Sequence, residues 1–510
     1  MLPIVDIPLV VKKFCSHFAS VFKRPEQQMN FEALVTALTV SENKTVAGMQ
    51  QQFLNGPTYE SLHHFMSNSP WSVENLREMR LRYVMARLLD AIKLADPLAS
   101  CNPPLPIGTI HRLENTIKEL SSDRFLPMVR ESEGRWCAAE QEHELLQCLS
   151  QLPKNKFGFR LIAAIDATFI HHAGERIHGV YWYWDYAQRR YVLAQRLVLS
   201  SLITMQKQIP LGWKLYHRGF LDEQKAYLEA TEPAADTSQE DWDEYNALVE
   251  TYEQNVKEHK TQHTLAAELI DDLEGLHLPV DAYVFDAALA VPELIDRLGD
   301  RPWVSRLAKN RHVQTAKGGF EKIESFAKSL DRAAFKPISV ETRHGEKRTY
   351  WCFSKVMMVR GWKRLRIVIS YDNEKLEGEP IYLLTNQKQW VQPQKVVQVY
   401  MMRDPVEHLI RDGKQELGLE GGQQRNEDGV RKHWELSFTA HTFLEFGLEL
   451  PNLPGVPAAR LETIGQKSRV MEGVILQGYT NLVKQWVLEG RDTKELVWQV
   501  MTQRLNRLAT

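Results

Sequence analysis

The spacing of apolar residues divides the chain into a helical beginning, a mixed middle and a helical end. In 1–155, apolar side chains recur at steps of three and four over 29–38, 73–94 and 110–121, which predicts amphipathic helices. Ser72 precedes the second of these as an N-cap, and the arginines that follow it, at 77, 80, 82 and 87, predict a basic helix face.

Two shorter helical stretches, at 44–53 and 59–66, are separated by a turn that contains Gly56 and Pro57. Their lengths are typical of a helix-turn-helix, the motif that places one helix in a DNA groove. Helical packing without any DNA contact explains the same pattern equally well.

At residue 156 the pattern changes to runs that favour strands. Runs at 180–184 and 191–199 are joined by a polar segment that contains Asp185 as a turn residue, which predicts a hairpin. The segment 202–211 either extends this sheet or begins a connection. Further strands at 159–165, 281–285 and 303–307 and helices at 264–276 and 291–298 complete an α/β layer.

Residues 311–380 interrupt this alternation with short β-rich runs, which predicts an antiparallel insertion. These runs lie at 338–343, 349–353, 355–359 and 365–371. A buried strand returns at 381–385, and helices follow at 392–417, 431–448 and 461–508. The predicted organisation is a helical DNA-binding region (1–155), a core (156–310), the β insertion (311–380), the rest of the core with a signature helix (381–450) and a helical C-terminal region (451–510).

Composition places the chain among ordinary globular proteins, with 43% hydrophobic and 25% charged residues. The net charge of −2 excludes a uniformly basic protein that coats nucleic acid. Twelve acids and two lysines nevertheless give 221–258 a balance of −10, and seventeen cations and five acids give 301–366 a balance of +12. This basic block, 301–366, either faces phosphate or pairs with the acidic stretch 221–258.

No apolar run approaches the length of about 20 residues that a membrane span needs. The first residues do not resemble a signal peptide, and the five cysteines are scattered without any CxxC pair. We therefore expect a cytoplasmic protein without disulfides, zinc or membrane contact.

Two of the predicted strands are followed by a carboxylate, Asp166 after 159–165 and Asp286 after 281–285. The carboxyl end of a strand lies at the sheet edge where ligands bind, so these two side chains are candidates for chemistry. Each of them alone is as readily explained as a turn former or a helix N-cap.

A third acidic position lies in the helical segment 392–417, where Tyr400, Arg403, Glu407 and Lys414 are spaced to share one helix face. Burying a helix face with these charged groups costs free energy unless they meet charged ligands. Metal ions would suit the carboxylate, and phosphate would suit the cations. The alternative is that Asp404-Pro405-Val406-Glu407 forms a capping box, in which Glu407 serves only its own helix.

With these residues the sequence resembles the DDE transposases of bacterial insertion sequences, within the RNase H-like superfamily. The Tyr-x2-Arg-x3-Glu-x6-Lys signature of one large branch is matched by Tyr400, Arg403, Glu407 and Lys414, and the Asp-x-Thr motif is matched by Asp166. The segments 303–310 and 431–446 also resemble this branch, so that the resemblance covers about 156–446.

The resemblance implies an α/β fold, an RNase H-like mixed-sheet core that a β insertion interrupts, flanked by helical regions. It implies an enzyme that binds insertion-sequence ends and cleaves and joins DNA with two Mg²⁺ or Mn²⁺ ions, held by Asp166, Asp286 and Glu407. Partners would be double-stranded DNA and a second subunit of a dimer, in a bacterial cytoplasm. DNA contacts are expected from residues outside the carboxylate set: Tyr400, Arg403, Lys414, Lys347, Arg348, Lys363, Arg364 and Trp362, the last by stacking on a flipped base.

Two other functions remain compatible with the same residues. A transposase-derived DNA-binding protein would keep the fold without transposition activity. A simple RNase H-like nuclease would cut without joining, although the large helical and β additions exceed what a plain nuclease needs. Trp362 is also compatible with a half-buried packing role, and His171, His172 and His178 are best explained as exposed hairpin residues.

Overall fold

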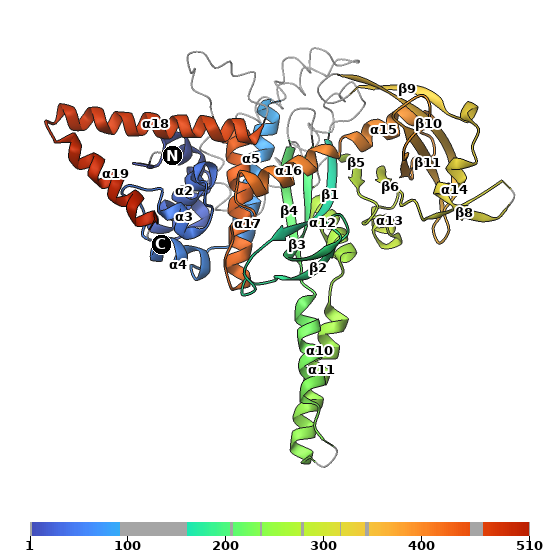
Figure 1. The fold of residues 1–510 in the computed structure, drawn as a ribbon, viewed down its shortest axis with the longest axis horizontal. Coiled ribbons are helices and arrows are strands. Elements are labelled where there is room, and N and C mark those ends of the chain that lie inside the picture. The colour runs from blue at the N-terminus through green and yellow to red at the C-terminus, as the bar shows by residue number, and fades with distance from the viewer. Residues whose placement is uncertain are drawn as a thin grey trace, which may run out of the picture. The chain divides into compact units, whose positions relative to one another are not determined.

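The computed structural model describes residues 3–91, 161–203, 208–234, 237–276, 280–316, 318–341, 346–448 and 463–508. Contacts divide the chain into two compact units, each assembled from separate stretches of sequence (Figure 1). The helical unit comprises Met1–Pro153, Arg176–His178 and His408–Thr510, and the sheet unit comprises Lys154–Glu175 and Gly179–Glu407. The predicted helix at 110–121 lies outside the described residues.

The sheet unit is built on one mixed sheet, which has ten strands within the described ranges. Nine of them follow the order β2-β3-β1-β5-β6-β12-β11-β10-β9, and β4 also pairs with β3. The strands are β1 (Leu161–His171), β2 (Tyr181–Asp185), β3 (Arg190–Ile203), β4 (Gln208–Tyr216), β5 (Val280–Phe285), β6 (Trp303–Arg306), β9 (Lys336–Glu341), β10 (Lys347–Met358), β11 (Arg364–Tyr371) and β12 (Ile381–Thr385).

The centre of this sheet has the strand order and directions of an RNase H-like core. Strand β3 runs antiparallel to β1 and to β4, whereas β1, β5 and β6 run parallel to one another. The parallel strands are buried runs of apolar residues, as expected for strands that are covered on both faces. The predicted α/β class with an RNase H-like core is confirmed.

The predicted antiparallel strands of 311–380 continue the same sheet, on the far side of β12. The runs expected separately at 349–353 and 355–359 form one strand, β10, because its pairing with β11 continues without a break from Trp351 to Met358. A small separate ladder joins β7 (His312–Gln314) to β8 (Phe320–Lys322).

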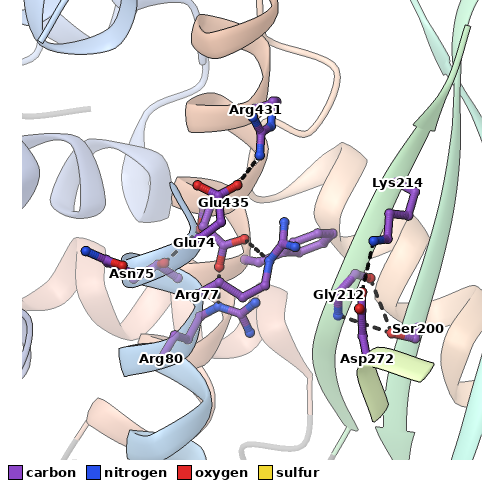
Figure 2. Close-up of polar contacts among 12 residues, drawn as sticks. Glu74, Asn75, Arg77, Arg80, Ser200, Gly212, Lys214, Asp272, Arg431 and Glu435 are labelled. Carbon is purple, nitrogen blue, oxygen red and sulfur yellow. Dashed lines mark hydrogen bonds and ion pairs between the residues drawn. The ribbon is translucent and has the colours of Figure 1, made fainter. Parts of the chain in front are cut away.

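Helices of the sheet unit pack on the sheet or on one another. Helix α12 (Gln262–Gly275) packs on β3 and β4, and α15 (Pro393–Met401) packs on β6, β9 and β12. Two short helices are α13 (Pro292–Leu298) and α14 (Ile323–Lys328). Polar contacts also fix the sheet: Ser200 bonds Gly212 across β3 and β4, and Lys214 pairs with Asp272 of α12 at 3.1 Å (Figure 2).

The acidic stretch 221–258 falls in two helices, α10 (Gly219–Thr231) and α11 (Gln239–Glu258), which lie side by side (Figure 1). No residue of α11 is buried. Within the described parts of the basic block, no cation forms an ion pair with an acid of this stretch, and the pairs that do form use other acids, such as Glu374 and Glu379. The alternative, pairing between the two charged segments, is therefore not observed among the described residues.

The helical unit combines helices from both ends of the sequence. Its N-terminal members are α1 (Leu9–Ser16), α2 (Pro25–Val40), α3 (Val46–Gln50), α4 (Tyr59–Ser67) and α5 (Val73–Ala91). Its C-terminal members are α17 (Glu427–Thr442), α18 (Ile464–Leu488) and α19 (Thr493–Leu508). Helix α17 is almost wholly buried against α2, α4 and α5, which makes it the centre of this unit. No described helix is long and apolar enough to cross a membrane.

The predicted basic face of α5 is wrong, although its predicted N-cap is confirmed by the Ser72 hydroxyl, which accepts the Asn75 N–H at 3.1 Å. Arg80 and Arg82 are fully buried. Arg80 donates to Glu435 of α17 at 2.7 Å, and Arg77 donates to the same carboxylate at 3.1 Å (Figure 2). These arginines therefore form part of the interior of the helical unit.

Candidate functional site

Asp166 lies in the middle of β1, although the sequence predicted that the strand ends just before it. The strand continues to His171 because the following residues pair antiparallel with β3, with Asp166 opposite Leu199. On the other side, the pairing with β5 stops at Ile165. Asp166 is thus the first residue of β1 beyond its parallel neighbour, and its side chain is buried.

Asp286 directly follows β5, as predicted. The preceding residue, Phe285, pairs with Ile165 of β1. Asp166 and Asp286 are therefore the next residues along two adjacent parallel strands. Neighbouring strands lie about 5 Å apart, which places the two backbones close together. Ser305 of β6 donates to the Asp286 carbonyl at 3.3 Å and fixes the start of the loop.

The helix predicted over 392–417 is broken, so Tyr400, Arg403, Glu407 and Lys414 do not share one continuous helix face. Helix α15 ends at Met401, the chain turns at Met402 and Arg403, and α16 (Asp404–Gln415) begins directly after. Pro405 accounts for the break because it has no N–H to donate, and its ring clashes with the carbonyl four residues earlier.

The break places Arg403 between two carboxylates. Its Nη2 donates to Asp166 Oδ2 at 2.8 Å, and its Nη1 donates to Glu407 Oε1 at 2.7 Å. Arg403 and Asp166 are buried, whereas Glu407 is exposed. The Nε of Arg403 is also buried, and it has no hydrogen-bond partner in the described part of the chain.

Burial and charge both shift the pKa values in this cluster. Burial raises the pKa of Asp166 to about 6, against the opposing effect of Arg403, and the charges of Asp286 and Glu407 raise it further. Burial also raises the pKa of Tyr400 to about 12. For Arg403, burial would lower the pKa, but Asp166 and the other acidic groups raise it, so its guanidinium stays charged.

The donor set suits a hard divalent cation, because carboxylate oxygens are the ligands that Mg²⁺ and Mn²⁺ prefer. The charges of Asp286 and Glu407 raise the pKa of Asp166, which also favours a cation beside this carboxylate. Arg403 supplies that positive charge in the structure, and no three acidic, cysteine or histidine side chains of the described residues are gathered closely enough to hold a metal.

The predicted DNA-contacting residues lie in different surroundings. In the helical unit, Lys414 forms an ion pair with Glu420 at 3.4 Å. Arg348 pairs with Glu346 at 3.1 Å, and Lys363 lies 3.8 Å from Asp296. Lys347 and Arg364 are also exposed, and within the described ranges they form no ion pair.

Trp362 lies in the turn between β10 and β11 and is half-buried. The guanidinium of Arg311 lies over its ring, 4.9 Å from the centroid. Motif spacing alone does not single out Arg311, although its place in the basic segment after β6 is a signal for it. One face of Trp362 is therefore already occupied by a cation.

Part of the chain matches a known protein family. Residues 246–443 match the family described as Transposase DDE domain, a range that includes Asp286, Arg403 and Glu407 but not Asp166. A search of curated proteins finds no match. The domain match indicates a DNA-cleaving transposase, and enzymes with this domain generally use divalent metal ions.

Proposed function

We propose that this protein cuts DNA at the ends of a bacterial insertion sequence and joins the released 3′ ends to target DNA. The observation that carries the proposal is the cluster of Asp166, Arg403 and Glu407 beside Asp286, at the edge of two parallel strands. This set combines the carboxylates and the cation that phosphoryl transfer requires.

Asp166, Asp286 and Glu407 would hold two Mg²⁺ or Mn²⁺ ions in this function. Such ions, when bound, favour in-line displacement at phosphorus by activating the attacking oxygen and stabilising the leaving one. The protein's own contribution is placement: two neighbouring strands fix the aspartates, and the first turn of α16 carries the glutamate.

Arg403 has a separate part in the proposal, that of binding the DNA phosphate. Its guanidinium stays charged, and its buried Nε has no acceptor among the described residues. A phosphate oxygen is a suitable acceptor, because guanidinium groups bind phosphates through paired N–H donors. Tyr400 packs beside Arg403, and Lys414 would also contact phosphate.

The test compares the variants Asp166→Asn, Asp286→Asn and Glu407→Gln with the wild type on a DNA that carries the element's end. Each substitution keeps the shape of the side chain and removes one anionic ligand. We expect cleavage and joining to fall at least about a thousandfold in each variant, while binding of the end changes little. Glu250→Gln is the matched control, because this exposed glutamate lies in α11, outside the cluster.

The same assay separates the alternatives. Full DNA binding with no Mg²⁺-dependent product in the wild type would indicate a DNA-binding protein without transposition activity. Cut ends that never join to target DNA would indicate a simple nuclease. Cleavage that survives in Glu407→Gln would assign the third carboxylate to another residue.

A further inference from the structure

The hairpin of β2 and β3 is apolar on both of its faces. One face carries Tyr183, Val192 and Ala194, which are buried in a core cluster with Phe169 and Tyr216. In an antiparallel sheet with one buried face, the other face is normally polar. Here the other face carries Trp182, Trp184 and Tyr191, and Tyr186 follows in the turn.

These four side chains, the aromatic face, are exposed to solvent: Trp182 by 51%, Trp184 by 41%, Tyr186 by 86% and Tyr191 by 65%. Three of them are in ring contact, and Trp182 lies two residues before Trp184 on the same face of β2. Trp184 and Tyr191 are directly opposite each other in the ladder, with ring centroids 5.2 Å apart, and Tyr186 packs edge-on against Trp184 at 6.5 Å. A contiguous patch of large apolar side chains marks an interaction site.

The exposed charge beside this patch is positive. The carboxylate of Asp185 is buried and accepts the N–H groups of Ala187 and Gln188, at 2.8 and 3.2 Å. Arg189 and Arg190 are exposed at the same turn, and neither has an acidic partner among the described residues. Arg189 also adopts a left-handed backbone conformation with φ of 54°, so the chain holds it in this turn at some cost.

We infer that the aromatic face binds single-stranded DNA. Every base has a flat face that stacks on tryptophan or tyrosine, and the arginines can contact the backbone phosphates. Paired bases in a duplex hide these faces, so unpaired DNA fits the surface better than double-stranded DNA does. The two exposed arginines at the turn favour a polyanion over a second protein, although the same residue types occur in protein interfaces.

The aromatic face is separate from the carboxylate cluster. Asp166 pairs with Leu199 of β3, and Tyr191 lies eight residues earlier on the same strand. At about 3.3 Å per residue the two positions are about 26 Å apart. The inference therefore does not depend on catalysis, and its test can be made without metal.

The test measures binding of the full-length protein to a fluorescein-labelled 20-nucleotide oligothymidine in EDTA, by fluorescence anisotropy. We expect the double variant Trp182→Ala, Trp184→Ala to weaken binding about five- to hundredfold. The matched control is Trp498→Ala, which removes a tryptophan of 63% exposure from α19 and should leave binding unchanged. Arg189→Gln with Arg190→Gln should lower the slope of log affinity against log salt concentration by about 1.4, because each phosphate contact with a single strand contributes about 0.7.

Three outcomes decide the inference. Loss of single-strand binding with unchanged binding of a 20-bp duplex supports it, and quenching of tryptophan fluorescence by the oligomer that disappears in the double tryptophan variant supports it independently. Unchanged single-strand affinity in the double tryptophan variant overturns it. A shift of the sedimentation coefficient in that variant, with single-strand binding intact, assigns the face to protein association and also overturns it. Because EDTA abolishes metal-dependent chemistry, failure here does not bear on the proposed cleavage activity.

Discussion

Glu435 is a carboxylate with no exposure to solvent, in contact with two arginines of another helix. Burial alone would raise its pKa, but Arg80 and Arg77 lower it, so the group stays ionised. We expect Glu435→Gln to reduce the free energy of unfolding by about 3–5 kcal/mol, because it leaves buried arginines without a counter-ion. Chemical denaturation measures this loss.

Arg431→Gln is the control for that measurement, because Arg431 pairs with Glu74 at the surface of the same unit (Figure 2). A surface pair contributes about 1 kcal/mol or less. Equal losses in the two variants would contradict the assignment of Glu435 as a buried structural charge.

Lys44 is a second residue whose charge is costly in the folded state. Burial lowers its pKa to about 8, although Glu416 and Glu472 oppose the shift. Above pH 8 the folded protein releases this proton, while the unfolded chain keeps it until about pH 10.4. The unfolded state then binds more protons, so this residue makes the free energy of unfolding rise with pH between these values.

We therefore expect the Lys44→Met variant to gain stability relative to the wild type below pH 8 and to lose that advantage as the pH approaches 10.5. The difference between the two proteins in the free energy of unfolding should change by about 3 kcal/mol over this window. Urea denaturation at several pH values measures it, with Lys23→Met as the exposed control. A difference that is constant with pH would show that Lys44 does not titrate there.

At the scale of elements, the break between α15 and α16 determines where Arg403 lies. Pro405→Ala restores the missing N–H and lets the two helices merge. We expect the merged helix to carry Arg403 away from Asp166 and to lower DNA cleavage about tenfold to hundredfold, because misplacement of about 1 Å has effects of this size.

Thermal unfolding should change little in this variant, which distinguishes a misplaced site from a destabilised protein. Pro393→Ala is the matched control, because Pro393 begins α15, where proline is compatible with a helix. Full activity of Pro405→Ala would mean that the break does not position the site.

Most elements could be predicted from the sequence, because the hairpin, β5 and the amphipathic helices have local signals. The position of Asp166 in the middle of β1 could not be predicted, since the strand continues beyond Asp166 only because it pairs with β3. The burial of Arg80 could not either, because its counter-ion lies 355 positions away in the sequence. The helix break was predictable, since Pro405 itself is the signal.

For the candidate site, the sequence spacing predicted which residues belong to it. The roles of these residues stay predictions. It did not predict that Arg403 contacts both Asp166 and Glu407, because that contact requires the turn at Met402 and the register of β1 beside β5. The aromatic face has a local signal, tyrosine and tryptophan alternating over 181–184, but exposure can be assigned only once the core side is known.

At the scale of the whole molecule, the basic block is only partly available to DNA. Lys347 and Arg364 are exposed without an ion pair among the described residues, whereas Arg348 and Lys363 have acidic neighbours. We expect Lys347→Gln with Arg364→Gln to flatten the salt dependence of binding to an insertion-sequence end by nearly two counterions.

The matched double variant, Arg348→Gln with Lys363→Gln, should flatten the salt dependence of DNA binding less, because these two cations already have acidic partners. Gel-shift titrations between 50 and 200 mM salt measure both slopes, the range over which phosphate contacts weaken most visibly. Equal slopes in the wild type and both variants would place the DNA-binding surface elsewhere.

The helical unit joins helices from both ends of the chain, and this has a consequence for synthesis on the ribosome. Arg80 and Glu435 are 355 positions apart, so at about 5–20 residues per second the N-terminal helices wait about 20–70 s for α17. The nascent helices cannot complete their core until translation is nearly finished. Premature termination before α17 therefore leaves the N-terminal helices without their packing partner as well as removing the C-terminal ones.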